Sequence, residues 1–187
     1  MKMAGNIAIS LFISLFLLQT AIAQTQKTPE ELAKETEEAC AATASTKSSP
    51  DKIEELVNKA CALLEKEGKA AFPKFRGKDS EFIYAGNYIF VQNTSGVMMM
   101  HPIKFKMEGQ NLIDMKDVNG KPFVMEMSKL ALEKGSGWME YMWPKPGSKE
   151  QSRKISYVKL CNVDGEKAAV GFGVWDMTDE EAQKVLK

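Results

Sequence analysis

The stretch VMMMHP, residues 97–102, places three thioethers directly before an imidazole, the only histidine of the chain. Soft sulfur ligands beside an imidazole select copper(I) among the biological metal ions. The same residues also suit the edge of a pocket for an organic molecule, or a core strand, because methionine fills irregular apolar space well. Three interpretations of this stretch are therefore open.

A strand through this stretch would divide the metal ligands between two faces. Side chains alternate along a strand, so Met98 and Met100 are predicted to share one face, and Met99 and His101 the other. A copper(I) site would then need sulfur from elsewhere, and the candidates are Met107, Met115, Met125, Met127, Met139 and Met142. Copper(I) handling stays an alternative function.

Other residue patterns argue against catalysis. One histidine cannot form a His-based acid–base pair, and the sequence has no Gly-rich phosphate loop and no paired-carboxylate motif. The spacing of the three cysteines fits no zinc site. We expect no enzyme activity, no cofactor and no metal.

The three cysteines are Cys40, Cys61 and Cys161. In an oxidising compartment a pair of them should form a disulfide. If the first two helices fold back as a hairpin, Cys40 and Cys61 approach each other, and a bridge needs Cα atoms within ~7 Å. We predict Cys40–Cys61, while a pairing with Cys161 stays open.

Residues 1–23 have the organisation of a secretory signal peptide. Lys2 supplies the charge, residues 7–18 are apolar, and Ala21-Ile22-Ala23 forms a cleavage box. The apolar run is shorter than the ~20 residues of a spanning helix. We expect cleavage after Ala23, a periplasmic or secreted protein, and no membrane insertion after cleavage.

The charges balance at 25 acidic and 25 basic residues. Binding to nucleic acid needs a concentrated positive surface, so a nucleic-acid partner is not expected. The division of the chain that we predict is a signal peptide at 1–23, a helical segment at 24–75 and a separate domain at 76–187.

Caps and hydrophobic periodicity predict the elements. Thr28 before Pro29 starts a helix over 28–45, and Pro50 starts a second one. A β-hairpin at 87–92 and 97–101, a long loop, a helix at 121–135, strands at 137–143, 154–161 and 168–175, and a terminal helix capped by Thr178 follow. This order favours an α+β fold, a five-stranded antiparallel sheet with helices on one face.

Several runs together carry a family resemblance: NYIFVQNTSGVMMMHP, MEGQNLIDMKDVNGKPFV, GSGWMEYMWPKPGSKE, KISYVKL and AVGFGVWDM. They resemble the single Cache domain, the extracytoplasmic sensor module of chemoreceptors and sensor kinases, here in a stand-alone secreted form. The resemblance implies a PAS-like antiparallel sheet with long N-terminal helices and an inner helix between strands two and three. It also implies a pocket for a small ligand, often a short organic acid, and a membrane receptor or transporter as partner.

The resemblance and the strand alternation together select the candidate site. Lys154 matches the lysine of the family's KxSY motif and would pair with a ligand carboxylate, because an unpaired buried charge is costly. Tyr157 would be a second donor or part of an aromatic wall. The predicted ligand contacts are Tyr88, His101, Tyr141, Trp143, Lys154 and Tyr157. The competing interpretation is a scaffold module without ligand, whose lysine is solvated and whose aromatic residues only pack.

Overall fold

The computed structural model describes residues 27–186. The predicted signal peptide lies outside this range. No helix within the described range is long and apolar enough to cross a bilayer.

Two helices and a 3-10 segment open the described chain: α2 (Pro29–Thr43), α3 (Pro50–Glu67) and η1 (Gly68–Phe75). The predicted start of α2 is confirmed, since Thr28 and Glu31 form a reciprocal capping box and Pro29 occupies the first helical position. On α3, one stripe of apolar side chains at helical spacing is buried: Ile53, Leu56, Val57, Ala60, Cys61 and Leu64.

An antiparallel sheet forms the centre of the fold. Its strands are β1 (Ile83–Tyr84), β2 (Asn87–Asn93), β3 (Met98–Met100), β4 (Ser136–Pro144), β5 (Gln151–Val163) and β6 (Glu166–Val174). They lie in the order β1-β2-β6-β5-β4, and β3 pairs with β2 outside this path. The five predicted strands are confirmed, and the two-residue β1 is an addition. The remaining helices are η2 (Phe105–Met107), α4 (Phe123–Lys134) and α5 (Asp179–Val185).

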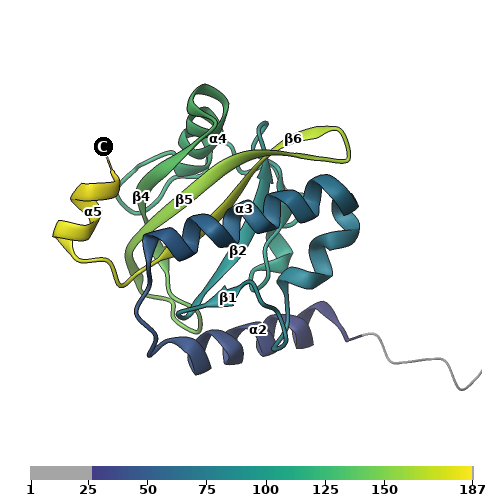
Figure 1. Cartoon of the computed structure of the whole chain (residues 1–187), viewed down its shortest axis with the longest axis horizontal. Coiled ribbons are helices and arrows are strands. Elements are labelled where there is room, and N and C mark those ends of the chain that lie inside the picture. Colours follow the sequence, from purple (N-terminus) through teal and green to yellow (C-terminus); the bar gives the residue numbers. More distant parts are fainter. Residues whose placement is uncertain (1–26, 187) are drawn as a thin grey trace, which may run out of the picture.

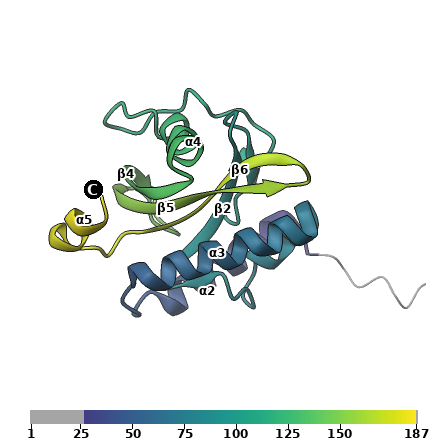
Figure 2. The same cartoon turned by 45° about the horizontal axis from the view of Figure 1, so that its top comes forward.

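The helices cover both faces of the sheet. α3 contacts β5 and β6 from one side, and α4 contacts β4, β5 and β6 from the other. α2 lies along the end of the sheet where β1 is (Figure 1), and Figure 2 shows α4 and α3 on opposite sides. The expectation of helices on one face is therefore wrong. β2 is buried along its whole length, which requires apolar cover on both sides.

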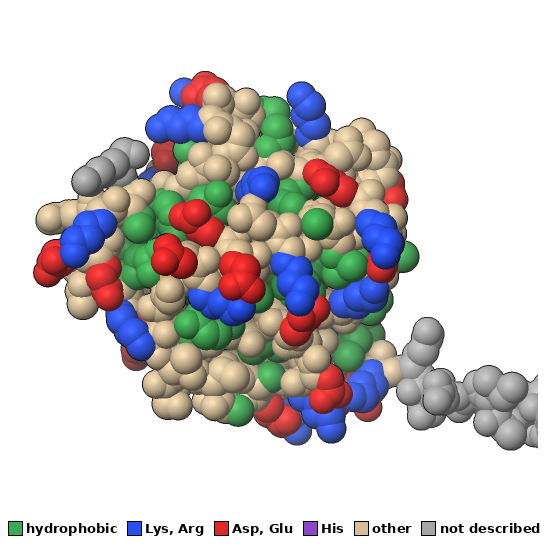
Figure 3. Space-filling model, in the orientation of Figure 1, with side chains coloured by type: hydrophobic (Ala, Val, Ile, Leu, Met, Phe, Trp, Pro, Cys, Tyr) green, Lys and Arg blue, Asp and Glu red, His purple; other side chains and the backbone are tan. Residues whose placement is uncertain are grey.

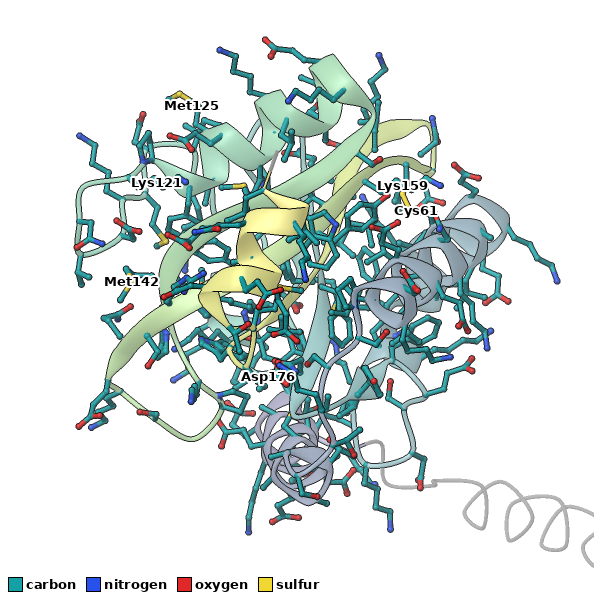
Figure 4. All side chains as sticks on the ribbon, turned by 60° about the vertical axis from the view of Figure 1, so that its left-hand side comes forward. Cys61, Lys121, Met125, Met142, Lys159 and Asp176 are labelled. Atoms are coloured by element: carbon teal, nitrogen blue, oxygen red, sulfur yellow. A yellow bond between two sulfur atoms is a disulfide. The ribbon has the colours of Figure 1, made fainter. Side chains whose placement is uncertain are left out.

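The predicted Cys40–Cys61 disulfide is also wrong. The bridge joins Cys61 to Cys161, with their Cα atoms 5.6 Å apart, and Cys40 is a buried free thiol. α3 packs against β5 instead of folding back onto α2, so Cys161 is the neighbour of Cys61. Figure 4 shows Cys61 on α3 close to Lys159 of β5, two residues before its partner.

A bulge corrects the predicted alternation in VMMMHP. The register between β2 and β3 shifts at Val91/Gln92, and a bulge changes which face the following side chains take. Met98 joins the cluster under α4, whereas Met100 joins the cluster under α3, with Met99 packed against that same α3 cluster. His101 consequently lies on the α4 side together with Met98.

The surface fits the balanced composition. Over the face that carries α3, positive and negative side chains are interspersed, with no continuous region of one sign (Figure 3). This face therefore shows no concentrated positive surface of the kind that nucleic-acid binding needs.

Candidate ligand-binding site

A small pocket lies between the sheet and α4, and we call it the inner pocket. β2, β4 and β5 form its floor, while α4 and the segment from β3 to η2 cover it. Its lining residues are Phe90, Gln92, Met98, His101, Met107, Phe123, Met127, Tyr141, Trp143 and Lys154. The lining is mostly apolar with a few polar groups, which is the usual composition of a small-molecule site.

Lys154 is the unusual residue of this pocket. The residue is 1% exposed, and within the described chain its ammonium has neither a hydrogen bond nor a carboxylate partner. Nζ lies 4.3 Å from the ring centroid of Trp175 and 4.5 Å from that of Tyr88. These cation–π contacts stabilise the charge only partly. Burial consequently lowers the pKa of Lys154 to about 7.

Two glycines of β6 make room for the side chains that build this site. A Cβ at Gly173 would stand 2.3 Å from Cε of Lys154, and one at Gly171 would stand 2.3 Å from the Phe90 ring. Both glycines pair with β5 residues of the α4 side, Ser156 and Val158. The missing side chains thus let Lys154 and Phe90 lie flat across the sheet.

His101 is held as a neutral hydrogen-bond donor. Its Nδ1 accepts the backbone N–H groups of Ile103 at 3.3 Å and Lys104 at 2.9 Å, so the ring proton must be on Nε2. Burial, and then the charge of Lys154, holds the pKa of His101 well below its usual range. Nε2 lies 3.5 Å from the hydroxyl of Tyr88, a distance at which a hydrogen bond is weak. The Nε2–H group can therefore donate a hydrogen bond to a ligand.

Tyr141 supplies a second polar group and part of the aromatic wall. Its ring stacks on Phe123, the first residue of α4, with centroids 4.8 Å apart. Its hydroxyl lies 3.1 Å from Oγ of Ser156. Since each hydroxyl carries one proton, this pair has a second O–H to donate. Burial raises the pKa of Tyr141, so the phenol is neutral.

Four of the six predicted contacts line the inner pocket: His101, Tyr141, Trp143 and Lys154. Tyr88 stands directly beside them, with its ring against Lys154 and His101. Tyr157 does not join them. Its side chain lies in the cluster under α3 and packs on Trp138, 5.3 Å away between centroids. Because neighbouring positions on β5 alternate, Lys154 and Tyr157 face opposite sides of the sheet.

Several lining residues were not predicted as contacts. Phe90 and Gln92 follow Tyr88 at two-residue spacing along β2, and Phe123 and Met127 lie four residues apart on α4. Strand and helix periodicity could have found both pairs once His101 or Lys154 was taken as a reference. Gln92 also fixes the cover of the pocket, because its Nε2 donates to the carbonyl of Val124 at 2.9 Å and to Ser128 at 3.1 Å.

The charge in the pocket decides what it can hold. Met98, Met107, Met127 and His101 do line one space, as a copper(I) site would require. The buried ammonium of Lys154 lies in that same space, however, and repels a metal cation. Met125 and Met142 do not line it, and both point outward (Figure 4). An anion fits this pocket better than copper(I) does.

Comparison with known proteins supports a sensor module. The model of the Cache domain family matches residues 23–163. The methyl-accepting chemotaxis protein McpP of Pseudomonas putida is 32% identical over 99 residues, which is 53% of this chain and 18% of that protein. The sensor histidine kinase MctS of Rhizobium johnstonii is 31% identical over 88 residues, 47% of this chain and 18% of the kinase. The matches thus span under a fifth of the length of these relatives.

Two solved structures are similar along nearly the whole chain. One is described as the periplasmic sensor domain of a chemotaxis protein, with 25% identity and a TM-score of 0.49. The other, described by its carboxylic acid recognition in a Cache chemosensory domain, has 26% identity and a TM-score of 0.49. Each covers 92% of this chain and is itself covered completely. Since the family model matches residues 23–163, most of the sequence, this chain belongs to the Cache domain family of non-catalytic, ligand-binding sensor modules.

Proposed function

We propose that the inner pocket binds a short monocarboxylate and that this is the signal the domain senses. The observation that carries the proposal is the unpaired, fully buried ammonium of Lys154. Burying an ion without a counterion is unfavourable, so a site that keeps one in place is best explained by a ligand of opposite charge. A carboxylate also accepts hydrogen bonds, which His101 and the Tyr141–Ser156 pair can donate.

The number of cations favours one carboxylate rather than two. Recognition of a second carboxylate commonly uses an arginine fork. Both arginines are engaged elsewhere: Arg76 pairs with Glu108 at 2.6 Å, and Arg153 pairs with Glu140 at 2.5 Å. Among the described residues, Lys154 is the only lysine or arginine that lines the inner pocket. A single negative charge therefore matches the site.

The available space favours a small ligand. The free volume of the inner pocket is about 20 Å³, roughly what one water molecule needs. Three flexible methionines, Met98, Met107 and Met127, belong to its lining, and methionine adapts its shape at low cost. We infer that a chain of two to four carbons is accommodated in the pocket by displacing these thioethers, with its apolar end toward α4.

Calorimetric titration with propionate and with propionamide tests the proposal. The two molecules have almost the same shape, but only propionate carries the charge. We expect propionate to bind, propionamide not to bind, and Lys154→Met to weaken propionate by about 100-fold or more, in line with truncation of a buried charge pair. Tyr157→Phe, which follows Ser156 on β5 but lies on the opposite face of the sheet, is the matched control and should bind normally. Equal binding of propionate and propionamide contradicts the proposal.

A wider set of ligands distinguishes the carboxylate site from the scaffold and copper(I) interpretations. Acetate, lactate, butyrate and silver(I), a copper(I) surrogate, belong in the same series. A ligand at about 100 times its Kd stabilises a domain by about 2.7 kcal/mol, which a thermal melt detects easily. No response to any carboxylate would leave the scaffold interpretation, whereas a response to silver(I) alone would restore the copper(I) interpretation.

Export and partner remain proposals beside this one. The signal-peptide pattern at residues 1–23 predicts that protein recovered outside the cytoplasm begins at Gln24, which intact-mass measurement checks. A protein that retains Lys2 in that fraction contradicts the cleavage. The expected membrane receptor or transporter rests on the family's role alone, and co-purification after cross-linking with and without propionate tests it.

A further inference from the structure

The inner pocket is lined almost entirely by buried side chains, so its ligand needs a route. Of its lining residues, all but Met107 and Trp143 are buried. A ligand can therefore pass only where a side chain or a segment moves. Two places on the pocket wall are candidates: the cover around Met107, and the wall behind Lys154.

A larger cavity lies behind Lys154, and we call it the outer cavity. It has a volume of about 260 Å³ and lies between α2, the turn from β1 to β2, the loop from β4 to β5 and the segment after β6. Cys40, Ala41 and Ala44 present one face of α2 to it, opposite Pro146 and Trp175. Ala41, Ala44 and Lys145 are exposed, so solvent reaches this cavity directly. Its walls have room for a molecule of a few carbons.

Trp175 stands between the outer cavity and Lys154, which lines the inner pocket. Its ring lines the outer cavity and lies 4.3 Å from the ammonium of Lys154. Together with Tyr88 and Cys40, which share one buried cluster, it forms the partition between the outer cavity and the lysine. Its indole Nε1 donates a hydrogen bond to the carbonyl of Trp143 at 3.0 Å. Asp176, the next residue, lies between α5 and α2 (Figure 4), where its carboxylate accepts the N–H of Ser48.

The cover around Met107 is held more firmly. The carboxylate of Glu108 accepts the backbone N–H of His101 at 2.7 Å and pairs with Arg76 at 2.6 Å. The next residue, Gly109, donates its N–H to the carbonyl of Met98 at 2.8 Å. Lifting the cover breaks all three contacts, whereas turning the Trp175 ring breaks one hydrogen bond and one cation–π contact with Lys154. The partition is therefore the easier place to open.

We propose that the outer cavity is the entrance to the inner pocket and that Trp175 is the gate between them. The ligand waits in the outer cavity, Trp175 turns, and the carboxylate meets Lys154 from the side of α2. Trp175 thereby sets the rate of ligand exchange and the largest ligand that can enter. The identity of the ligand in this inference rests on the proposed function. The route itself is a statement about access to Lys154 and can be tested without that ligand.

Filling the entrance tests the proposal. Ala41→Trp narrows the outer cavity, while Ala42→Trp places the same bulk on the exposed neighbouring position, which does not line the cavity. With propionate in stopped-flow fluorescence, we expect Ala41→Trp to slow association and dissociation by about tenfold each, so that Kd is unchanged. Ala42→Trp should change neither rate. Equal rates in the two variants would overturn the proposal.

Weakening the hold on Trp175 should change the exchange rates in the opposite direction. This second variant tests the proposal even if Ala41→Trp fails to fold. Trp175→Phe keeps an aromatic ring against Lys154 but removes the indole N–H that bonds to Trp143. Both exchange rates should rise by a few fold. Rates at or below those of the natural protein would contradict a gate at this position.

A chemical probe separates failure of the route from failure of the proposed function. Formaldehyde with cyanoborohydride methylates accessible amines, and peptide mass spectrometry measures how fast Lys154 is modified. Ala41→Trp should slow this modification by about tenfold relative to Ala42→Trp, because the small reagent diffuses along the same route. Equal modification rates overturn the route even if propionate binds. Slowed modification without any propionate binding supports the route and rejects the carboxylate.

Discussion

The two faces of the sheet are built from alternate residues of the same strands, yet their interiors differ. Under α3, the buried cluster is apolar apart from the Tyr157 hydroxyl and is joined to the helix by the Cys61–Cys161 disulfide. Under α4, five buried residues on or near the cluster are polar or charged: Gln92, His101, Ser128, Lys154 and Ser156. On β5 the change occurs from one residue to the next, with Ile155 on one side and Lys154 on the other.

The difference indicates that the two faces have different roles. Apolar burial and a cross-link stabilise a fold without selecting a ligand. Buried polar groups cost stability unless they are paired, and here the central one, Lys154, has no protein partner. The α3 face therefore stabilises the fold, whereas the α4 face buries polar groups that cost stability and can recognise a ligand. Changes on the α3 face should alter stability alone, and changes on the α4 face should alter affinity.

The largest expected effect is on the α3 face. Replacing Cys61 and Cys161 by alanine removes a link between residues 100 positions apart. Loss of a loop of that length should lower the free energy of unfolding by about 2–5 kcal/mol. Urea denaturation measures this loss. The Kd for propionate, measured well below the new midpoint, should stay within about twofold, because the ligand does not touch this face.

Cys40→Ala is the control for that experiment, since Cys40 is buried but not bridged. Its effect should be about 1 kcal/mol, the cost of a small cavity. A disulfide-free variant that unfolds as easily as Cys40→Ala contradicts the stabilising role of the bridge. A tenfold change in the Kd of the disulfide-free variant for propionate contradicts the idea that the α3 face affects stability alone.

On the α4 face, Lys154→Met should have opposite effects on stability and binding. The pKa of Lys154 in the folded protein is about 7, against about 10.4 for an ordinary lysine. The unfolded chain therefore binds the proton more strongly, and the folded protein is penalised at every pH below that ordinary value. Below pH 7 the penalty is complete, and between pH 7 and about 10.4 it fades as pH rises.

Removing the amine should therefore raise the free energy of unfolding by an amount on the order of 1–4 kcal/mol at pH 6. The gain should be smaller at pH 9, because the folded lysine is then neutral in the natural protein. Thermal melts at the two pH values measure both quantities. A variant that is less stable than the natural protein at pH 6 would show that the ammonium has a stabilising partner.

The pH dependence of affinity tests the same group without mutation. A carboxylate pairs with the protonated amine, whose pKa in the free protein is about 7. Affinity for propionate should be constant from about pH 5.5 to 6.5 and then fall up to tenfold per pH unit above pH 7. His101 contributes no step in this range, because burial holds its pKa well below the usual value. Calorimetry at pH 6, 7, 8 and 9 checks the profile, and a flat profile contradicts pairing with Lys154.

Local rules predicted the elements because the signals are local. Thr28 before Pro29 starts the helix as expected, with a capping box to Glu31, and side-chain alternation along β5 places Lys154 and Ile155 on opposite faces. The same alternation places Tyr157 opposite Lys154, so the expectation of Tyr157 as a ligand contact, which came from the family motif, does not fit the geometry. Residue spacing thus predicts faces reliably where a strand is regular.

Features that depend on long-range packing could not be predicted in this way. The partner of Cys61 lies 100 residues away, and only the packing of α3 on β5 brings it close. The bulge in β3 between Met98 and Met100 depends on how β2 and β3 align. Gly171 and Gly173 look like flexible positions in the sequence, although their purpose is to leave room for Phe90 and Lys154. The outer cavity arises only where α2, β1 and two loops meet.

The smallest expected effect compares one chemical change on both faces. Tyr141→Phe removes a hydroxyl that lies 3.1 Å from Ser156 and leaves that buried Oγ without a partner. The free energy of unfolding should fall by about 1–2 kcal/mol, and propionate should bind less tightly by about three- to tenfold if the pair donates to it. Tyr157→Phe, whose hydroxyl has no hydrogen bond to the described residues, should change stability by less than about 0.5 kcal/mol and leave the affinity unaltered. Urea denaturation and calorimetry on the two variants give four numbers. Equal effects of the two substitutions would mean that the faces differ in composition but not in their role.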